Sequence, residues 1–155
     1  MSMEKQTTAW QQSITLPNDI ASVPQLHDFV DSIAEKAELD MSLAMSICLA
    51  LEEAVVNVMS YAYPPDVRGE INIEAFLEGD ELRFVVSDAG QPFDPTAQAD
   101  VDTTLSAEER PIGGLGIFLV RQIMDNVSYE RLDGKNVLTM RKNVRTEEQN
   151  TLLEL

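Results

Sequence analysis

The sequence is poor in cysteine and in unbroken apolar stretches. It has one cysteine, Cys48, in 155 residues, which excludes an internal disulfide and a cysteine-rich metal site. A single cysteine and the absence of an apolar leader at the start fit the reducing cytoplasm. No uninterrupted apolar run approaches the roughly 18 residues of a membrane span, so we expect a protein that does not cross a membrane.

Basic residues are also scarce. The chain has 11 Lys+Arg against 27 Asp+Glu, which gives a formal net charge of -16 at pH 7. Nucleic-acid binding needs a basic face that neutralises phosphates, and anionic membranes attract basic segments. We therefore expect no direct contact with nucleic acid or with a membrane surface, and we expect protein partners that present basic faces.

The length and the 44% hydrophobic content are those of one domain with its own core. Apolar spacing predicts a strand over 9–16, a helix from Ser22 to about Ala37, and a longer helix over 40–61. In the longer helix, the apolar residues near one stripe are Met41, Met45, Cys48, Leu49 and Val56.

In the second half of the chain, apolar and polar residues alternate with a period of two. Strands over 71–77 and 82–86 flank a Gly79-Asp80 turn, and strands over 127–132 and 136–141 flank Asp133-Gly134. A long loop over 92–112 and a helix after Gly116 lie between these hairpins. The order of elements predicts an α+β fold, an α/β two-layer sandwich with helices on one face of a mostly antiparallel sheet.

Glu53 and Asn57 lie four residues apart, so they share one face of the longer helix. A carboxamide oxygen is a suitable ligand for Mg²⁺, and a nearby carboxylate can orient or deprotonate a nucleophile. A solvated polar helix face would contain the same pair of residues.

Asp88 comes at the end of an apolar strand, where a buried carboxylate needs a hydrogen-bond partner. An adenine amino group is such a partner, and Gly90 would allow the backbone to approach the ring. An ordinary turn through Gly90 and Pro92 is the alternative.

The glycines from Gly113 to Gly116 precede a helix, and free N–H groups at a helix start can bind an anion. The segment is not a Walker A loop because no Gly-Lys-Ser/Thr follows, and it is not a dinucleotide fingerprint because a loop precedes it. A flexible loop before a helix is again the alternative.

Taken in order, Glu53-x-x-x-Asn57, Asp88-x-Gly90, a long loop and Gly114-x-Gly116 resemble the N, G1 and G2 boxes of the GHKL ATPases, which have the Bergerat-type fold. The residues around these boxes, over 51–64, 88–95 and 110–125, are similar to those of the small bacterial anti-sigma factor serine kinases. The likeness covers roughly residues 12–142. It implies one histidine-kinase-like ATPase domain over 1–142, with an ATP lid at about 94–112 and a C-terminal tail over 143–155.

The resemblance implies ATP and Mg²⁺ as cofactors. Asn57 would hold Mg²⁺ on the ATP phosphates, Glu53 would be the catalytic base or orient the attacking hydroxyl, and Asp88 would bind the adenine amino group. The further nucleotide-binding residues that it implies are Gly90, Gly114, Leu115, Gly116, Thr139 and Arg110, of which Arg110 is the basic residue nearest to the family's lid arginine. Pro92 stands where many members of the superfamily have a glycine.

The activity implied is that of a cytoplasmic serine/threonine protein kinase in transcription regulation. Such kinases phosphorylate a small STAS-like anti-sigma-factor antagonist and sequester a sigma factor, and the resemblance leaves a homodimer open. The alternative is a non-catalytic module that binds nucleotide or sequesters a partner without kinase activity.

Overall fold

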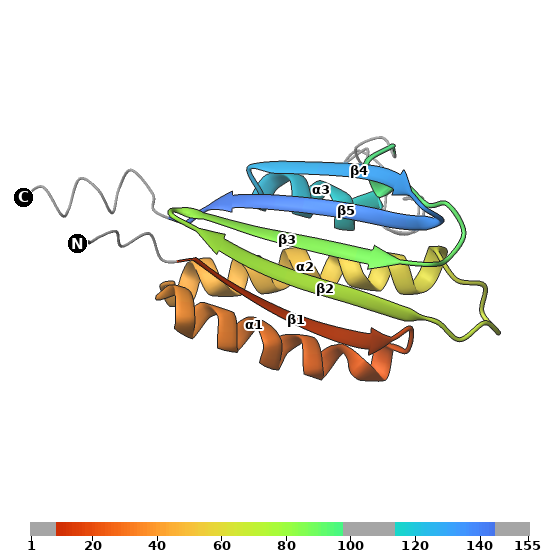
Figure 1. The fold of residues 1–155 in the computed structure, drawn as a ribbon, viewed down its shortest axis with the longest axis horizontal. Coiled ribbons are helices and arrows are strands. Elements are labelled where there is room, and N and C mark those ends of the chain that lie inside the picture. Colours follow the sequence, from red (N-terminus) through yellow and green to blue (C-terminus); the bar gives the residue numbers. More distant parts are fainter. Residues whose placement is uncertain (1–8, 98–113, 145–155) are drawn as a thin grey trace, which may run out of the picture.

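The computed structural model describes residues 9–97 and 114–144. Five strands form one antiparallel sheet in the order β1-β2-β3-β5-β4, and the helices lie on one of its faces (Figure 1). The predicted two-layer α+β fold is confirmed. The strands are β1 (Ala9–Pro17), β2 (Glu70–Glu78), β3 (Glu81–Asp88), β4 (Asn126–Leu132) and β5 (Lys135–Asn143). The helices are α1 (Val23–Ala37), α2 (Met41–Tyr61) and α3 (Gly114–Ile123), with short 3-10 turns η1 (Ile20–Ser22) and η2 (Pro95–Ala97).

Both predicted hairpins form at the predicted turns. Gly79 has φ of 62°, and Asp133 and Gly134 have φ of 53° and 79°. Positive φ values at the turn suit the right-handed twist of the flanking strands, and glycine adopts them without steric cost. The hairpins then join because β3 pairs with β5, which brings Asp88 opposite Asn136.

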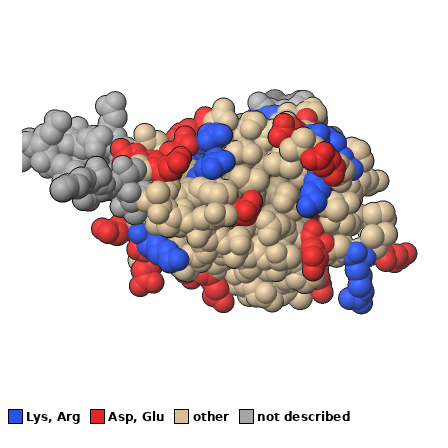
Figure 2. All heavy atoms as spheres, viewed as in Figure 1, with Lys and Arg blue, Asp and Glu red and all other residues tan. Residues whose placement is uncertain are grey.

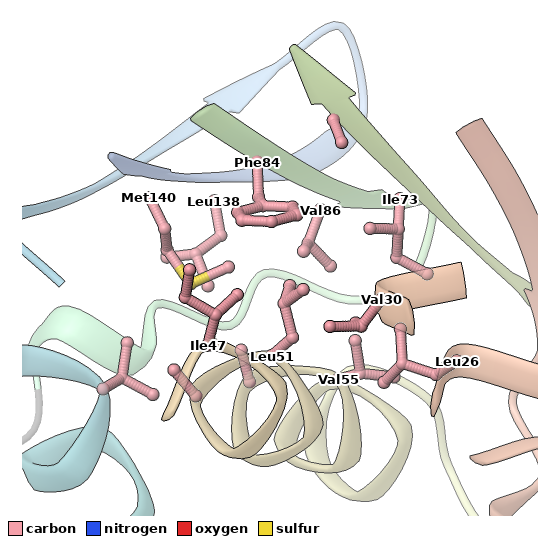
Figure 3. Close-up of a cluster of buried hydrophobic side chains, with 14 of the residues drawn as sticks. Leu26, Val30, Ile47, Leu51, Val55, Ile73, Phe84, Val86, Leu138 and Met140 are labelled. Atoms are coloured by element: carbon pink, nitrogen blue, oxygen red, sulfur yellow. The ribbon is translucent and has the colours of Figure 1, made fainter. Parts of the chain in front are cut away.

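The core lies between the sheet and α2 (Figure 3). Ile47, Leu51 and Val55 of α2 are fully buried, and so is Phe84 of β3. By length and composition, α2 is the one helix among the described residues that could cross a membrane, because it is largely apolar and its only charged residues are Glu52 and Glu53. Its buried residues pack under the sheet, so its apolar character is that of a core helix.

The predicted apolar stripe of α2 is on the wrong face. Met41, Met45 and Leu49 are exposed, the first two at 78% and 66% of their surface, and Cys48 and Val56 are half-buried. The core face consists instead of Ile47, Ala50, Leu51, Ala54, Val55 and Val58. Since α2 has apolar residues on both sides, helical spacing alone does not identify the side that packs on the sheet.

The packed domain extends slightly beyond the predicted boundary at residue 142. β5 ends at Asn143, and Val144 is buried and donates its N–H to the carbonyl of Asp80 at 2.8 Å. Of the predicted lid, only 94–97 are described, and they include η2. The remainder, over 98–112, lies outside the described residues, as does the tail from 145 onward.

Candidate functional site

The structure brings Glu53 and Asn57 of α2 against the first turn of α3. Asn57 is buried and Glu53 half-buried. A methyl group at Gly116 would lie 2.8 Å from Oε2 of Glu53 and 3.4 Å from Nδ2 of Asn57. The glycine therefore lets the start of α3 approach both polar side chains closely.

Two other predicted residues, Gly114 and Leu115, form the first turn of α3 together with Gly116. The N–H groups of a first helical turn have no partner within the helix, and the helix dipole favours an anion there. This end of α3 therefore combines backbone donors that have no partner within the helix with the carboxylate of Glu53 and the carboxamide of Asn57. Arg110 lies outside the described residues.

Asp88 ends β3 on the face of the sheet that packs on the helices, and it is only 4% exposed. Its Oδ1 accepts hydrogen bonds from the N–H of Gly90 at 2.8 Å and from Nδ2 of Asn136 at 2.9 Å. Its Oδ2 is buried and has no hydrogen-bond partner among the residues that the structure describes. A buried acceptor without a partner is costly, so this oxygen suits a donor on a ligand.

Gly90 is required by close packing against the end of α2. A methyl group at this position would lie 2.3 Å from the carbonyl oxygen of Ala62, and the next residue, Gln91, donates its N–H to that same oxygen at 2.8 Å. Beyond Pro92, the ring of Phe93 packs beside Tyr61 with centroids 5.3 Å apart. The loop after Asp88 is thus attached to the C-terminal end of α2.

Tyr63 fixes the other side of this loop. Its hydroxyl accepts from the N–H of Ala89 at 3.1 Å and donates to the carbonyl of Glu70 at 2.8 Å. Burial is the main cause that raises the pKa of Tyr63, so the hydroxyl keeps its proton and both bonds at neutral pH. The strand end at Asp88 is therefore attached to the start of β2 as well as to α2.

Thr139, which the resemblance implies is a nucleotide-binding residue, does not lie with this group. It pairs with Val85 of β3 and alternates with the buried Leu138 and Met140. Because successive side chains of a strand point to opposite faces, Thr139 lies on the outer face of the sheet, away from Asp88.

Asn136 is the residue of β5 that lies beside Asp88, and the sequence reading missed it. It is only 4% exposed. Its Nδ2 donates to Oδ1 of Asp88 at 2.9 Å and to the carbonyl of Gln91 at 2.8 Å. Its Oδ1 accepts from the N–H of Phe93 at 3.1 Å and from the hydroxyl of Tyr129 at 2.6 Å. The available signal was its position in β5, three residues from Thr139 and so on the opposite face.

The site around Glu53 and Asn57 offers few protein ligands for a metal ion. The described residues contain no group of three or more His, Cys, Asp or Glu side chains that could hold an ion. Mg²⁺ is commonly bound by one or two protein oxygens together with phosphate oxygens and water. The single carboxamide of Asn57 beside Glu53 fits that mode and does not fit an ion held by protein alone.

An open cavity of about 750 Å³ lies elsewhere, at the end of the sheet where β2 begins. Its lining includes Thr15, Asn72 and Ser87, and it shares Asp88 and the neighbouring Tyr63 and Ala89 with the surroundings of the site. Thr15, Asn72 and Ser87 alternate with core residues along their strands, so the cavity opens on the outer face of the sheet. It is separate from Glu53, Asn57 and Gly116.

Comparisons with known proteins identify the family of the chain. A family model described as the histidine kinase-like ATPase domain matches residues 16–142. The serine-protein kinase RsbW of Listeria monocytogenes serovar 1/2a is 32% identical over 113 residues, which are 70% of this chain and 72% of that protein. RsbW of Halalkalibacterium halodurans is 30% identical over 139 residues, 87% of this chain and 84% of that protein.

Two further relatives extend the comparison. The serine/threonine-protein kinase BtrW of Bordetella bronchiseptica is 29% identical over 112 residues, 72% of this chain and 79% of that protein. A crystal structure of the RsbU and RsbW domains of Rv1364c from Mycobacterium tuberculosis has the same fold, with a TM-score of 0.62 and 20% identity. That match covers 86% of this chain and 32% of the other.

Proposed function

The chain belongs to the histidine kinase-like ATPase family, and from that premise we propose that it is an ATP- and Mg²⁺-dependent serine/threonine protein kinase of the anti-sigma-factor type. The observation that carries the nucleotide assignment is the buried Oδ2 of Asp88, which has no partner among the described residues. The 6-amino group of adenine is a donor that would satisfy this oxygen.

The phosphate end of the nucleotide is assigned to the start of α3. Backbone N–H groups of Gly114, Leu115 and Gly116 would bind the phosphate oxygens. Asn57 would hold Mg²⁺, which when bound neutralises charge on the phosphates. The missing side chain at Gly116 leaves the space that the phosphates need beside Glu53.

Glu53 is assigned the role of catalytic base. Its Oε2 lies at the start of α3, where it can orient a serine or threonine hydroxyl and accept its proton as the γ-phosphoryl group is transferred. The neighbouring Glu52 is directed to α1, where its Oε1 lies 2.6 Å from Nε2 of His27. The two adjacent glutamates thus have different surroundings, and only Glu53 lies beside Gly116.

The named relatives, which are serine-protein and serine/threonine-protein kinases, support a protein serine or threonine as the acceptor, and the resemblance to the anti-sigma factor kinases supplies the proposed partners. The substrate is a serine or threonine of a small STAS-like anti-sigma-factor antagonist, and the chain sequesters a sigma factor in the cytoplasm when that antagonist is absent. This partner switch needs no contact of the chain itself with nucleic acid or with a membrane.

The test is transfer of label from radioactive ATP to a STAS-like antagonist domain in the presence of Mg²⁺. Glu53→Gln should abolish transfer and leave ATP binding intact, because the change removes the base and keeps the shape of the side chain. Glu52→Gln is the matched control and should transfer label like the wild type. Chelation of Mg²⁺ should stop transfer in every variant.

Three results would contradict parts of the proposal. Transfer that survives Glu53→Gln would exclude Glu53 as the base. Tight binding of the antagonist without any transfer by the wild type would indicate a non-catalytic sequestering module. A melting temperature that ATP and Mg²⁺ leave unchanged would count against nucleotide binding itself.

A further inference from the structure

Asn136 uses its full hydrogen-bonding capacity inside the domain. A carboxamide can donate two bonds and accept two. The donated bonds go to Asp88 and Gln91, and the accepted bonds come from Phe93 and Tyr129. A buried polar group that is satisfied this completely is held in one orientation.

The fixed carboxamide of Asn136 also holds the carboxylate of Asp88 in one orientation. Both donors to Asp88, the N–H of Gly90 and Nδ2 of Asn136, point at the same oxygen, Oδ1. Rotation of the carboxylate would break both bonds. Oδ2 therefore remains the carboxylate oxygen that has no partner among the described residues and is left for a donor on a ligand.

The unpaired acceptor distinguishes between purines. Adenine has a 6-amino group, which donates, whereas guanine bound in the same orientation presents a 6-carbonyl group, which accepts and cannot bond to a carboxylate acceptor oxygen. A site built around a buried polar group rejects a ligand that leaves this group unpaired more strongly than an apolar site does.

Asn136 also holds the loop that follows Asp88. Its bonds to the carbonyl of Gln91 and the N–H of Phe93 fix two residues of the loop, and the ring of Phe93 packs on Tyr61 of α2. One side chain thus sets both the direction of the carboxylate and the position of the loop beside it.

We infer that Asn136 is a positioning residue for purine selectivity: it holds Asp88 and the loop over 91–93 so that the site accepts adenine nucleotides and rejects guanine nucleotides. The inference rests on the proposed function, since it requires ATP to bind at Asp88.

The experiment compares the dissociation constants of ATP and GTP, measured by titration calorimetry for the full chain and for variants checked by circular dichroism. Asn136→Leu keeps the approximate size and removes all four bonds, so the preference for ATP over GTP should fall at least about tenfold. Asn136→Thr keeps one hydroxyl donor and should hold the preference within about threefold of the wild type. Asn72→Leu, on the outer face where Asn72 bonds to Thr15, is the matched control and should keep the full preference.

The outcomes separate this inference from the proposed function. A wild type that binds neither nucleotide would overturn the proposed function. A wild type that prefers ATP, with the same preference in Asn136→Leu, would overturn only the role of Asn136, because a merely structural residue would weaken both affinities together. If the Leu variant does not fold, Asn136→Asp carries the test. This variant has the same size and faces Asp88 with an acceptor, so its preference should also fall at least about tenfold.

Discussion

Gly116 lies where the start of α3 meets Glu53 and Asn57, and a side chain there would enter the space beside Oε2 of Glu53. We predict that Gly116→Ala lowers the rate of phosphotransfer at least about tenfold, because the methyl group displaces the carboxylate of Glu53, the proposed catalytic base. The melting temperature should not fall, since alanine favours the helix by about 1 kcal/mol over glycine and the displaced group is the flexible end of a side chain. Kinetics and thermal unfolding of the same preparation check both statements.

At Gly79, in contrast to Gly116, a side chain would meet no neighbouring atoms but would strain the backbone. Nothing lies within 4 Å of a methyl group at this turn, but its φ is 62°. Gly79→Ala should therefore cost about 1–2 kcal/mol of unfolding free energy through backbone strain alone. Phosphotransfer per folded molecule should be unchanged. A loss of transfer in Gly79→Ala equal to that in Gly116→Ala would contradict the steric explanation for Gly116.

The surroundings of Cys48 should slow the reaction of its thiol with alkylating reagents. Burial, followed by the charges of Glu52 and Asp31, raises the pKa of the thiol. A raised pKa reduces the thiolate fraction at any given pH, and the thiolate is the reactive form. At about pH 8, iodoacetamide should modify Cys48 several-fold more slowly in the folded than in the denatured protein. Glu52→Gln should increase the rate at which iodoacetamide modifies Cys48 in the folded protein. Equal rates for the folded, the denatured and the Glu52→Gln protein would refute the prediction.

Single residues show how far the sequence could predict the site. Glu53, Asn57, Asp88 and their glycines could be proposed from the sequence because their order and spacing match a known set of motifs. Motif matching does not determine which strand residues face the helices, so it selected Thr139, which lies on the outer face, and did not select Asn136, which lies beside Asp88. Only the pairing of β3 with β5 puts Asp88 opposite Asn136.

At the scale of elements, α2 connects the core to the site. Leu51 is fully buried among core residues, and Met45 is 66% exposed on the other side of the same helix. Leu51→Ala should lower the free energy of unfolding by about 2–5 kcal/mol, because it leaves a cavity. Met45→Ala should change it by no more than about 0.5 kcal/mol. Chemical denaturation of the two variants checks the difference, and similar losses would mean that Met45 packs on a surface within the protein.

The predictability of each element depended on its pattern. The strands of the two hairpins alternate strictly, so their limits and turns were predicted well. α2 was located correctly, but its buried face was not, because apolar residues occupy both sides of the helix. Tertiary packing under the sheet selects the side of Ile47 and Leu51, and that information is not local in the sequence.

At the scale of the whole molecule, the charge is unevenly distributed. The face of the sheet in Figure 2 shows acidic and basic side chains together around its edges. On and just after α1, by contrast, Asp28, Asp31, Glu35 and Glu38 are exposed, and the one Lys or Arg from 23 to 40 is Lys36. A partner that docks on this side should present a basic surface.

Partner binding should therefore depend on salt. Raising the ionic strength from about 0.05 to about 0.5 M should weaken binding of the antagonist domain or the sigma factor at least about tenfold, because salt screens exposed charges. Titrations at several salt concentrations measure the effect. An affinity that is indifferent to salt would show that the acidic surface of α1 does not take part in binding.

The pairing of β3 with β5 also sets the order in which the protein becomes functional as it folds. Each hairpin can close locally within microseconds, but Asp88 and Asn136 are 48 residues apart in the chain and meet only after α3 and β4 have been enclosed. Contacts between distant residues form late because their loops must close first. In refolding experiments, the ability to bind ATP should therefore appear after the far-ultraviolet circular dichroism signal of the strands and helices. The newly made chain would pass through a stage with most of its secondary structure and no nucleotide site.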